Sequence, residues 1–510
     1  MNLRDRTVLV LGLGVSGLAM ARWCARQGAV VRVADSRRQP PQLEALCAEL
    51  PQAMVHAGGI DAGLLDGVEL LCVSPGIAPS DAAFGPLLAA ARANGVDAVT
   101  ELGLFSAALR ELQQAQGYAP SLLAITGTNG KTTVTALTAH LLQGAGVDAV
   151  AVGNIGPAML DVLAERLDAG RLPAAWVLEL SSFQLHGADD LAATAATVLN
   201  VTQDHLDWHG DMRAYAADKA RIFGPLPWTL TQPPGLMLLN RDDPQVLGMG
   251  REGRKLQTFG LDAPARAGDW GIAVEHGVAW LARAQDVETE ETQARMSKRR
   301  GKAQPPAIDL PVSLQMLMPA DALRIQGRHN WANALAALAL ACSTGTALAP
   351  MLHALRSYRG EPHRMQSLGV IEGVEWIEDS KGTNVGATVA ALTGLDRPVV
   401  LIAGGDGKGQ DFAPLAAAAR GRVRAAVLIG RDAGRIAQAL EGVCPTEQMA
   451  SLELATQRVA ELAGAGDVAL LSPACASLDM FRNYAHRAEV FTACVAELAH
   501  AHGVMLEAAS

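Results

Sequence analysis

The sequence has no paired cysteines, no long apolar runs and no clustered charge, and each absence excludes a class of protein. Seven cysteines are scattered over 510 residues and none forms a CxxC pair, so we expect reduced thiols and a cytoplasmic protein. No apolar run reaches the roughly 20 residues of a membrane span, and the chain opens on a predicted core strand rather than a signal peptide. The net charge of −10 is spread along the chain, which argues against binding to nucleic acid.

Glycine and aliphatic residues are abundant instead, and they indicate an α/β protein. Half of the residues are hydrophobic and 51 are glycine, and strand and helix patterns alternate nearly throughout, as in parallel sheets wrapped by helices. The length predicts about three domains. We place a Rossmann-like domain at 1–100, a P-loop ATPase-like domain with a mostly parallel sheet at 101–360, and a second Rossmann-like domain at 361–510. The polar segment 288–306 lacks aromatic residues and is predicted to be an exposed insertion.

The first candidate binding motif is the glycine-rich segment Gly12–Gly17, which follows the apolar run VLVL. Asp35 ends the next predicted strand, about 20 residues beyond the glycines, as in dinucleotide-binding units. A helix N-terminus at such a turn receives any pyrophosphate. From the residues alone, a nicotinamide dinucleotide and a UDP-sugar therefore both remain open.

A second glycine-rich segment, TGTNGKTT at 126–133, is typical of a nucleoside triphosphate site. It lies between an apolar strand and a helix pattern, where backbone N–H groups converge on phosphate oxygens. Lys131 adds a point charge, and Thr132 offers a hydroxyl to Mg²⁺. Ile125 stands where the standard loop has its first glycine, and a glycine turn without a ligand is the competing interpretation.

Two later residues are candidate metal ligands. Glu179 comes directly after the apolar residues Val177 and Leu178, and His205 lies shortly after a second apolar run that ends near Asn200. Both are therefore predicted near the carboxyl edge of one sheet, where parallel α/β proteins bind ligands. Mg²⁺ prefers oxygen ligands, and one or two carboxylates with triphosphate oxygens would serve it. Taken singly, each residue would more often be a structural strand-end residue. Their position downstream of a phosphate loop in one predicted sheet favours the metal site instead.

Taken in order, these motifs resemble the Mur ligases of bacterial cell-wall synthesis. The resemblance covers nearly the whole chain and departs from it mainly at 288–306. It rests on the blocks GLGVSG, TGTNGKTT, VLELSSFQL, NVTQDHLDWH, DKARIF, GRHNWANALAAL, EPHRM, DSKGTN, IAGGDGKG and LSPACASLDMFRNY.

The resemblance implies an enzyme that uses ATP to join D-glutamate to UDP-N-acetylmuramoyl-L-alanine. The substrate carboxylate would become an acyl phosphate, which the amine of D-glutamate attacks; two Mg²⁺ ions and positive side chains would neutralise the meeting anions. The resemblance also implies that the first glycine motif binds the UDP of the substrate rather than a nicotinamide dinucleotide. It further implies small-molecule substrates, no nucleic acid, no membrane insertion and a monomer.

The same resemblance assigns residues to each ligand. The catalytic residues are Lys131, Lys219, His205 and Arg364. The ATP-binding residues are Gly127, Thr128, Asn129, Gly130, Lys131, Thr132, Thr133, Asn330, Asn333, His363, Arg364 and Asp379. The residues for the UDP-substrate are Ser16, Gly17, Asp35, Ser36, Arg37, Gly76, Asn154 and His205. The residues for D-glutamate are Lys381, Thr383, Lys408, Ser477 and Tyr484. The metal ligands are Thr132, Glu179, His205 and Lys219.

Two of these assignments are unusual. In the family the lysine that matches Lys219 is carbamylated, which turns a cation into a carboxylate able to hold Mg²⁺; from the residues alone, Lys219 would be a solvated helix lysine. Tyr484 stands where phenylalanine is expected, which keeps an aromatic wall but adds a hydroxyl.

Three other functions compete with this one. A related Mur ligase would add a different amino acid, although ACASLDMFRNY favours D-glutamate. A folylpolyglutamate synthase-like ligase would share the ATP core but lack the N-terminal UDP unit. A non-catalytic UDP-sugar or ATP sensor would have no need of Lys131, Glu179, His205 and Lys219 together.

Overall fold

The computed structural model describes residues 1–510 except 189–190, 225–234, 252, 288–311 and 506–510. The predicted insertion at 288–306 lies outside the described residues. Two compact units make up the rest. The first contains Met1–Val201, His205–Thr258 and Ala336–Met351, and the second contains Thr202–Asp204, Phe259–Leu335 and Leu352–Ser510.

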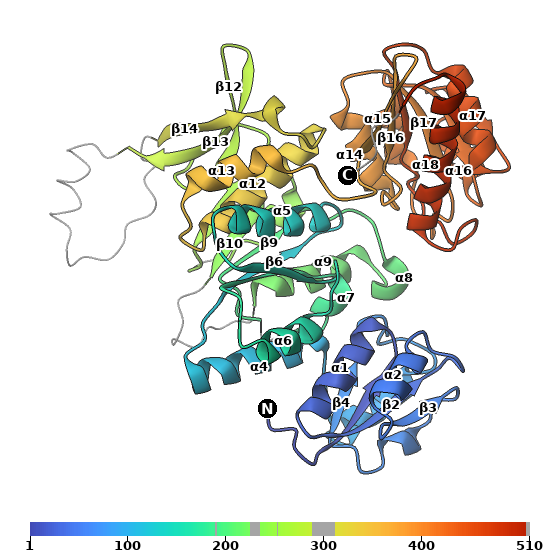
Figure 1. The fold of residues 1–510 in the computed structure, drawn as a ribbon. Helices are drawn as coiled ribbons and strands as arrows, with labels where there is room; N and C mark the ends of the chain where they lie inside the picture. Colours follow the sequence, from blue (N-terminus) through green and yellow to red (C-terminus); the bar gives the residue numbers. More distant parts are fainter. Residues whose placement is uncertain (189–190, 225–234, 252, 288–311, 506–510) are drawn as a thin grey trace. The chain divides into compact units, whose positions relative to one another are not determined.

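The first unit begins with a five-stranded parallel sheet in the order β3-β2-β1-β4-β5, which confirms the predicted Rossmann-like domain (Figure 1). In β1, Val8 and Val10 face one core while Leu9 and Leu11 face another, as the two-residue period of a strand dictates. The elements are β1 (Thr7–Leu11), α1 (Val15–Arg26), β2 (Val30–Asp35), α2 (Leu43–Glu49), β3 (Met54–Ala57), η1 (Ala62–Leu65), β4 (Leu70–Val73), α3 (Gly85–Ala93) and β5 (Asp97–Val99).

The same unit continues into parallel strands in the order β10-β9-β6-β8-β7. Helix α4 begins at Glu101, after the N-cap Thr100, and packs with α1 and α6, so the two sheets of this unit share one core. The elements are α4 (Glu101–Gln116), β6 (Ser121–Thr126), α5 (Lys131–Gly144), β7 (Ala149–Gly153), α6 (Met159–Asp168), β8 (Ala175–Glu179), α7 (Ser182–Leu185), β9 (Ala195–Val198), α8 (Leu206–His209), α9 (Met212–Ala220), η2 (Arg221–Phe223), β10 (Leu236–Asn240), α10 (Pro244–Leu247) and β11 (Leu256–Phe259).

The second unit opens with an antiparallel ribbon, a local exception to the strand and helix alternation that the sequence predicts nearly throughout. Strand β12 pairs with β13 and β13 with β14, both antiparallel. The tight turn after Glu275 lets β13 run back along β12 without a helix. The elements are β12 (Trp270–Glu275), β13 (Val278–Asp286), β14 (Val312–Pro319) and η3 (Ala320–Ala322). Helices α12 (Arg328–Cys342) and α13 (Leu348–Ser357) follow, and their part within Ala336–Met351 belongs to the first unit.

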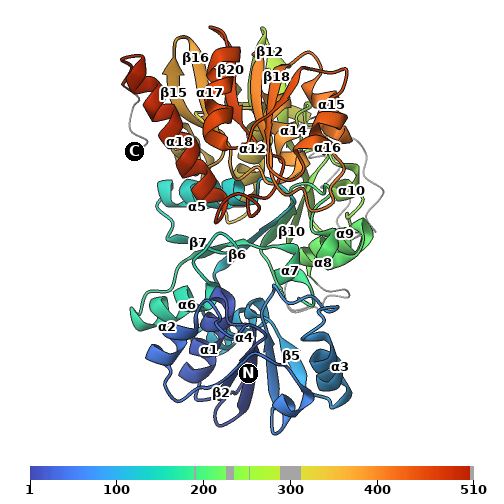
Figure 2. The same cartoon turned by 90° about the vertical axis from the view of Figure 1, so that its right-hand side faces the viewer.

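The second unit ends in a six-stranded sheet in the order β15-β16-β20-β17-β18-β19 (Figure 2). Only the edge hairpin of β15 and β16 is antiparallel, as expected for the second Rossmann-like domain. Helices α14, α15 and α16 pack on one face, and α17 and α18 on the other. The elements are β15 (Gln366–Ile371), β16 (Val374–Glu378), α14 (Val385–Gly394), β17 (Val399–Gly404), α15 (Ala413–Ala419), β18 (Val423–Ile429), α16 (Ala433–Ala439), β19 (Thr446–Gln448), α17 (Leu452–Leu462), β20 (Val468–Leu471) and α18 (Tyr484–Ala501).

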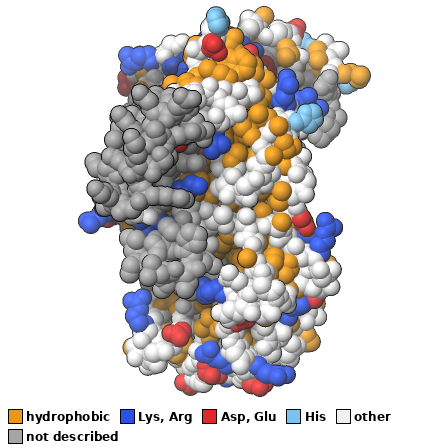
Figure 3. Space-filling view, turned by 90° about the vertical axis from the view of Figure 1, so that its left-hand side faces the viewer, with side chains coloured by type: hydrophobic (Ala, Val, Ile, Leu, Met, Phe, Trp, Pro, Cys, Tyr) orange, Lys and Arg blue, Asp and Glu red, His pale blue; other side chains and the backbone are white. Residues whose placement is uncertain are grey.

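Two further observations concern the surface. On the face that Figure 3 shows, basic and acidic side chains are interspersed rather than gathered into a stripe. Among the described residues, no helix is both long enough and apolar enough to cross a membrane.

Candidate functional site

The segment 126–133 forms the predicted loop between a strand and a helix. Strand β6 ends at Thr126 and α5 begins at Lys131, with Gly130 as its N-cap in a left-handed conformation (φ +83°). Gly127 also needs its glycine, because a Cβ atom there would lie 2.9 Å from the Leu199 side chain at a positive φ. The loop is tied to the end of β9, since Asn129 N–H donates to Asn200 Oδ1 at 2.8 Å. Thr132 and Thr133 lie buried in the first turn of α5.

Two lysines that are far apart in the sequence meet at this loop. Lys131 Nζ donates to the carbonyl oxygens of Gly127 and Thr128, each at 2.8 Å. Lys219 Nζ donates to the same Gly127 oxygen at 2.9 Å and lies 4.4 Å from the centroid of the Tyr215 ring. Only 1% of Lys219 is exposed, so the solvated-lysine interpretation was wrong.

Glu179 lies at the end of β8, as predicted, and is 1% exposed. Its Oε1 accepts a hydrogen bond from Asn154 Nδ2 at 2.7 Å. Its Oε2 is buried and has no hydrogen-bond partner among the described residues. A buried carboxylate oxygen left without a donor is suited to a cation. Asn154, predicted to contact the UDP-substrate, thus contacts the candidate metal ligand.

The described residues contain no group of three His, Cys, Asp or Glu side chains that could hold a metal ion. A cation near Glu179 therefore needs other oxygen donors. The Thr132 hydroxyl, phosphate oxygens and water are all hard oxygen ligands of the kind that Mg²⁺ prefers. The donor set thus fits Mg²⁺ better than a thiophilic metal.

His205 is the N-cap residue of α8, has a left-handed conformation (φ +54°) and belongs to a cluster of rings. Its ring centroid lies 4.7 Å from that of Phe183 and 6.4 Å from that of Tyr215. The Tyr215 hydroxyl contacts Thr128 Oγ1 at 3.1 Å. His205 is therefore linked to the phosphate loop through the face of α9 that also carries Lys219.

The N-terminal glycine motif has the close-packed turn that its sequence predicts. Gly12 has φ +81°, and a Cβ atom on Gly17 would lie 1.9 Å from the Gly12 carbonyl oxygen. Ser74 Oγ donates to that oxygen at 2.8 Å. Next to the motif, the Ser16 hydroxyl is hydrogen-bonded to the buried carboxyl of Glu101, whose pKa burial raises. The sequence did not point to Glu101.

Asp35, which is predicted to lie at the uridine, is hydrogen-bonded to this turn. Its Oδ2 accepts a hydrogen bond from Leu13 N–H at 2.7 Å, and Arg37 donates to both carboxylate oxygens. Burial opposes its charge, but these hydrogen bonds outweigh burial and lower its pKa to about 2. Ser36 is exposed, and nothing lies within 4 Å of a Cβ atom placed on Gly76. A carboxylate so engaged is poorly placed to bind a ribose hydroxyl, the role of this acid in dinucleotide sites.

In the second unit, the predicted adenosine residues lie on α12 and at the end of β16. Asn333 Nδ2 donates to Asn330 Oδ1 at 2.9 Å, which confirms that the two amides share a helix face. Asp379 is buried; burial raises its pKa to about 7, although hydrogen bonds from Ser472 and the nearby charge of Arg364 oppose the shift. His363 contacts Glu378 Oε2 at 2.8 Å.

The predicted D-glutamate residues lie on neighbouring turns of the same unit. Lys381 Nζ lies 5.5 Å from the centroid of the Tyr484 ring, and Thr383 N–H donates to the Lys381 carbonyl oxygen at 3.0 Å. The turn that carries exposed Lys408 is joined to the turn before buried Ser477 by a bridge between Asp406 and Ala476.

Arg487 supports these turns, and no motif in the sequence pointed to it. The side chain is 1% exposed, and it donates to Ser380 Oγ, to the Ser380 carbonyl and to the Cys475 carbonyl. Burial lowers its pKa to about 10. Arg487 follows the FRNY motif by three residues, and only the tertiary structure identifies it as a support for these turns.

A surface hollow of about 700 Å³ lies elsewhere, on the outer face of α9. Met212, Arg213 and Arg251 line it, and Lys219 does not. This hollow is therefore not the phosphate-loop site.

Three family models match the chain. The Mur ligase MurD-like N-terminal domain matches 6–100, the Mur ligase middle domain matches 125–341, and the Mur ligase glutamate ligase domain matches 363–475.

Full-length relatives carry the name UDP-N-acetylmuramoylalanine--D-glutamate ligase. The protein from Cupriavidus pinatubonensis is 54% identical over 99% of both chains, and that from Burkholderia pseudomallei is 52% identical over 98% of both. Among solved structures, MurF ligase from Thermotoga maritima in complex with ADP has a TM-score of 0.56 at 13% identity, covering 98% of this chain and 96% of its own. UDP-N-acetylmuramate-alanine ligase MurC from the same organism has a TM-score of 0.53 at 17% identity, covering 96% and 99%. The two structures show likeness of fold.

Proposed function

The chain belongs to the Mur ligase family, and from that premise we propose that it joins D-glutamate to UDP-N-acetylmuramoyl-L-alanine in a reaction driven by ATP. The family, the three-domain α/β fold and the ligase class predicted from the motifs are confirmed. The relatives bear the name of this activity over the full length of the chain.

The observation that carries the proposal is the convergence at the phosphate loop. Lys131 and Lys219 bond the same carbonyl of Gly127, and Glu179 lies at the neighbouring strand end with a buried oxygen free of hydrogen bonds among the described residues. Moving a phosphoryl group onto a carboxylate brings two anions together, so fixed positive charge and metal-binding oxygens are the main requirement.

Each residue of the loop has a role in this proposal. The loop from Gly127 to Gly130 cradles the triphosphate, and Lys131 neutralises its terminal phosphates. Thr132, Glu179 and His205, with Lys219 as a carbamate, would hold two Mg²⁺ ions, and these ions would supply positive charge for phosphoryl transfer.

The most specific part of the proposal is that Lys219 is carbamylated. A carbamate forms from the neutral amine, and burial disfavours a charged ammonium. Lys219 is buried, and it lies on the same oxygen as the cationic Lys131. Both features favour conversion of this amine into an anion.

The substrates occupy the remaining predicted sites. The turn from Gly12 to Gly17 receives the UDP pyrophosphate, with Asp35 holding that turn and Arg37 beside it. Asn330, Asn333, His363, Arg364 and Asp379 take the adenosine end of ATP. Lys381, Thr383, Lys408 and Ser477 bind the carboxylates of D-glutamate, and Tyr484 forms the aromatic wall. We keep the division at 1–100, 101–360 and 361–510, a monomer and a cytoplasmic location as parts of the proposal.

One assay tests the function. Purified enzyme, ATP, Mg²⁺ and UDP-N-acetylmuramoyl-L-alanine are combined with D-glutamate, and ADP release is followed. We expect turnover with D-glutamate and little with L-alanine, L-glutamate or a diamino acid. Preference for another amino acid would indicate a different Mur ligase. Turnover with a folate and L-glutamate would indicate a folylpolyglutamate synthase-like enzyme, and binding without ADP release a sensor.

A further inference from the structure

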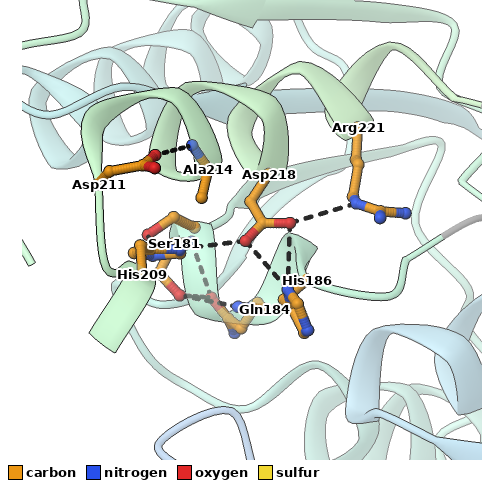
Figure 4. Close-up of polar contacts among 9 residues, drawn as sticks. Ser181, Gln184, His186, His209, Asp211, Ala214, Asp218 and Arg221 are labelled. Carbon is orange, nitrogen blue, oxygen red and sulfur yellow. Dashed lines mark hydrogen bonds and ion pairs between the residues drawn. The ribbon is translucent and has the colours of Figure 1, made fainter. Parts of the chain in front are cut away.

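Asp218, immediately before Lys219, receives polar contacts from three directions (Figure 4). His209 Nδ1 lies 3.1 Å from its Oδ2, His186 Nδ1 lies 3.0 Å from the same oxygen, and Arg221 Nε donates to its Oδ1 at 3.2 Å. Asp218 is buried, so these three contacts are what compensates the carboxylate for its loss of water. Asp218 is therefore a buried anion that depends on its neighbours.

His209 extends this network to a second helix. Its Nε2 lies 2.9 Å from Ser182 Oγ, so Ser182, His209 and Asp218 form a continuous hydrogen-bonded chain. The order resembles that of a hydrolytic triad, but Ser182 is 2% exposed and the His209 side chain is fully buried. A hydroxyl that no substrate can reach is not a nucleophile. The chain of contacts instead holds α7, α8 and α9 together.

The two ends of the network adjoin two of the four proposed metal ligands, Glu179 and Lys219. Ser182 begins α7, three residues after Glu179, and Asp218 precedes Lys219 on α9. On α9, Tyr215, Asp218 and Lys219 are the buried residues, at spacings that place them on one helix face. Tyr215 contacts Thr128 of the phosphate loop, while Asp218 is anchored toward α7.

We propose that Ser182, His209 and Asp218 are positioning residues that fix the segment bearing Lys219 relative to the segment that follows Glu179, and so set the geometry of metal binding. The inference rests on the proposed function, in which Glu179 and Lys219 hold Mg²⁺. Residues that orient metal ligands commonly change metal affinity or activity by about 10–100-fold when they are replaced.

The experiment compares two variants of the network with a control on the same helix. Asp218→Asn removes the anion, and His209→Phe keeps an aromatic ring but removes both hydrogen bonds. The control is Asp211→Ala, because Asp211 caps α9 through Ala214 N–H at 2.8 Å and lies outside the network. Mn²⁺ binding in the presence of a non-hydrolysable ATP analogue is measured by electron paramagnetic resonance. Thermal unfolding and calorimetry with UDP-N-acetylmuramoyl-L-alanine are measured on the same samples.

We expect both network variants to bind Mn²⁺ about tenfold more weakly and to lose kcat, with unchanged affinity for the UDP-substrate. Asp211→Ala should lose thermal stability but bind Mn²⁺ like the wild type. Network variants that lose stability yet bind Mn²⁺ as tightly as Asp211→Ala would overturn the inference. If Asp218→Asn does not fold, Ser182→Ala, which removes one hydroxyl, must still weaken Mn²⁺ binding, and unchanged binding refutes the inference. A Lys219→Met enzyme with full turnover and Mn²⁺ binding would instead refute the role of Lys219 in the proposed function.

Discussion

Replacement of Lys219 separates a chemical role from a packing role, because the side chain is 1% exposed. Lys219→Ala removes roughly three methylene groups from a buried site, at about 0.8 kcal/mol each, so a loss of about 2–3 kcal/mol is expected before any cavity cost. Lys219→Met keeps most of the buried stem and should cost less than about 1.5 kcal/mol. Loss of the hydrogen bond to Gly127 is common to both variants, and removal of a buried charge partly offsets it.

The activity of the variants should depend on whether residue 219 can bind Mg²⁺, and not on the size of its side chain. If Lys219 as a carbamate holds Mg²⁺, Ala, Met and Arg variants should all lose at least about 10²-fold in ADP release. Arg gives no rescue, since it presents a cation where the metal needs an anion. Short carboxylic acids added to Lys219→Ala should restore part of the activity by supplying the missing oxygen ligand.

Two measurements decide this prediction. ADP release gives the activity of each variant, and urea unfolding gives the stability of the transition that includes α9. A Met variant with near wild-type turnover beside an inactive Ala variant would refute the chemical role and leave packing as the explanation. As a control, the wild type freed of CO₂ should lose activity and regain it with bicarbonate.

Three further predictions test the phosphate loop and the N-terminal turn. Lys131→Ala should reduce ADP release by about 10²–10³-fold while calorimetry shows unchanged binding of the UDP-substrate; near wild-type release would contradict the phosphate-loop assignment. Asp35 has a pKa lowered to about 2 from 3.8, so its charge contributes about 2 kcal/mol of stability that is present above about pH 4 and lost as pH falls through 2. Asp35→Asn should lose that amount in urea at pH 7, and a loss that persists unchanged at pH 2 would contradict this origin. Gly17→Ala should destabilise the unit, since its Cβ meets the Gly12 oxygen, whereas Gly14→Ala has open space and should fold normally. Calorimetry should show that the Gly14→Ala variant binds the UDP-substrate more weakly than the wild type and that the wild type does not bind NADH. A micromolar affinity of the wild type for NADH would reverse the UDP assignment.

Local pattern explains why much of the site could be predicted. The loop at 126–133 and the position of Glu179 follow from apolar runs ending in glycine or a polar residue, and strand ends in a parallel sheet meet at one edge. The pairing of Asn330 with Asn333 follows from helical spacing. These features depend on neighbours in the sequence, so the sequence alone reveals them.

The burial of Lys219 could not be predicted in this way. Helix α9 reads MRAYAADKA and has no apolar stripe, and the residues it buries include two charged side chains, Asp218 and Lys219. Their partners come from α7, α8 and the phosphate loop, which only the tertiary fold brings together. Asp35 is a similar case: the motif predicts an acid, but only the structure shows that Leu13 N–H and Arg37 already occupy it. The sequence thus shows where a charged residue stands, but its role can be assigned only when its hydrogen-bond partners are known.

The contact of Lys131 and Lys219 with one oxygen has an electrostatic consequence. Both Nζ atoms lie within 2.9 Å of the Gly127 carbonyl oxygen, so the two ammonium groups would be less than about 6 Å apart and would repel each other by about 3 kcal/mol at an effective dielectric constant of about 20. In the proposed function, a carbamate on Lys219 would convert that repulsion into attraction, and a triphosphate against Lys131 would neutralise the other charge. The arrangement therefore favours anions at this loop. The same arithmetic explains why an arginine at position 219, permanently charged, should be among the most damaging substitutions in the site.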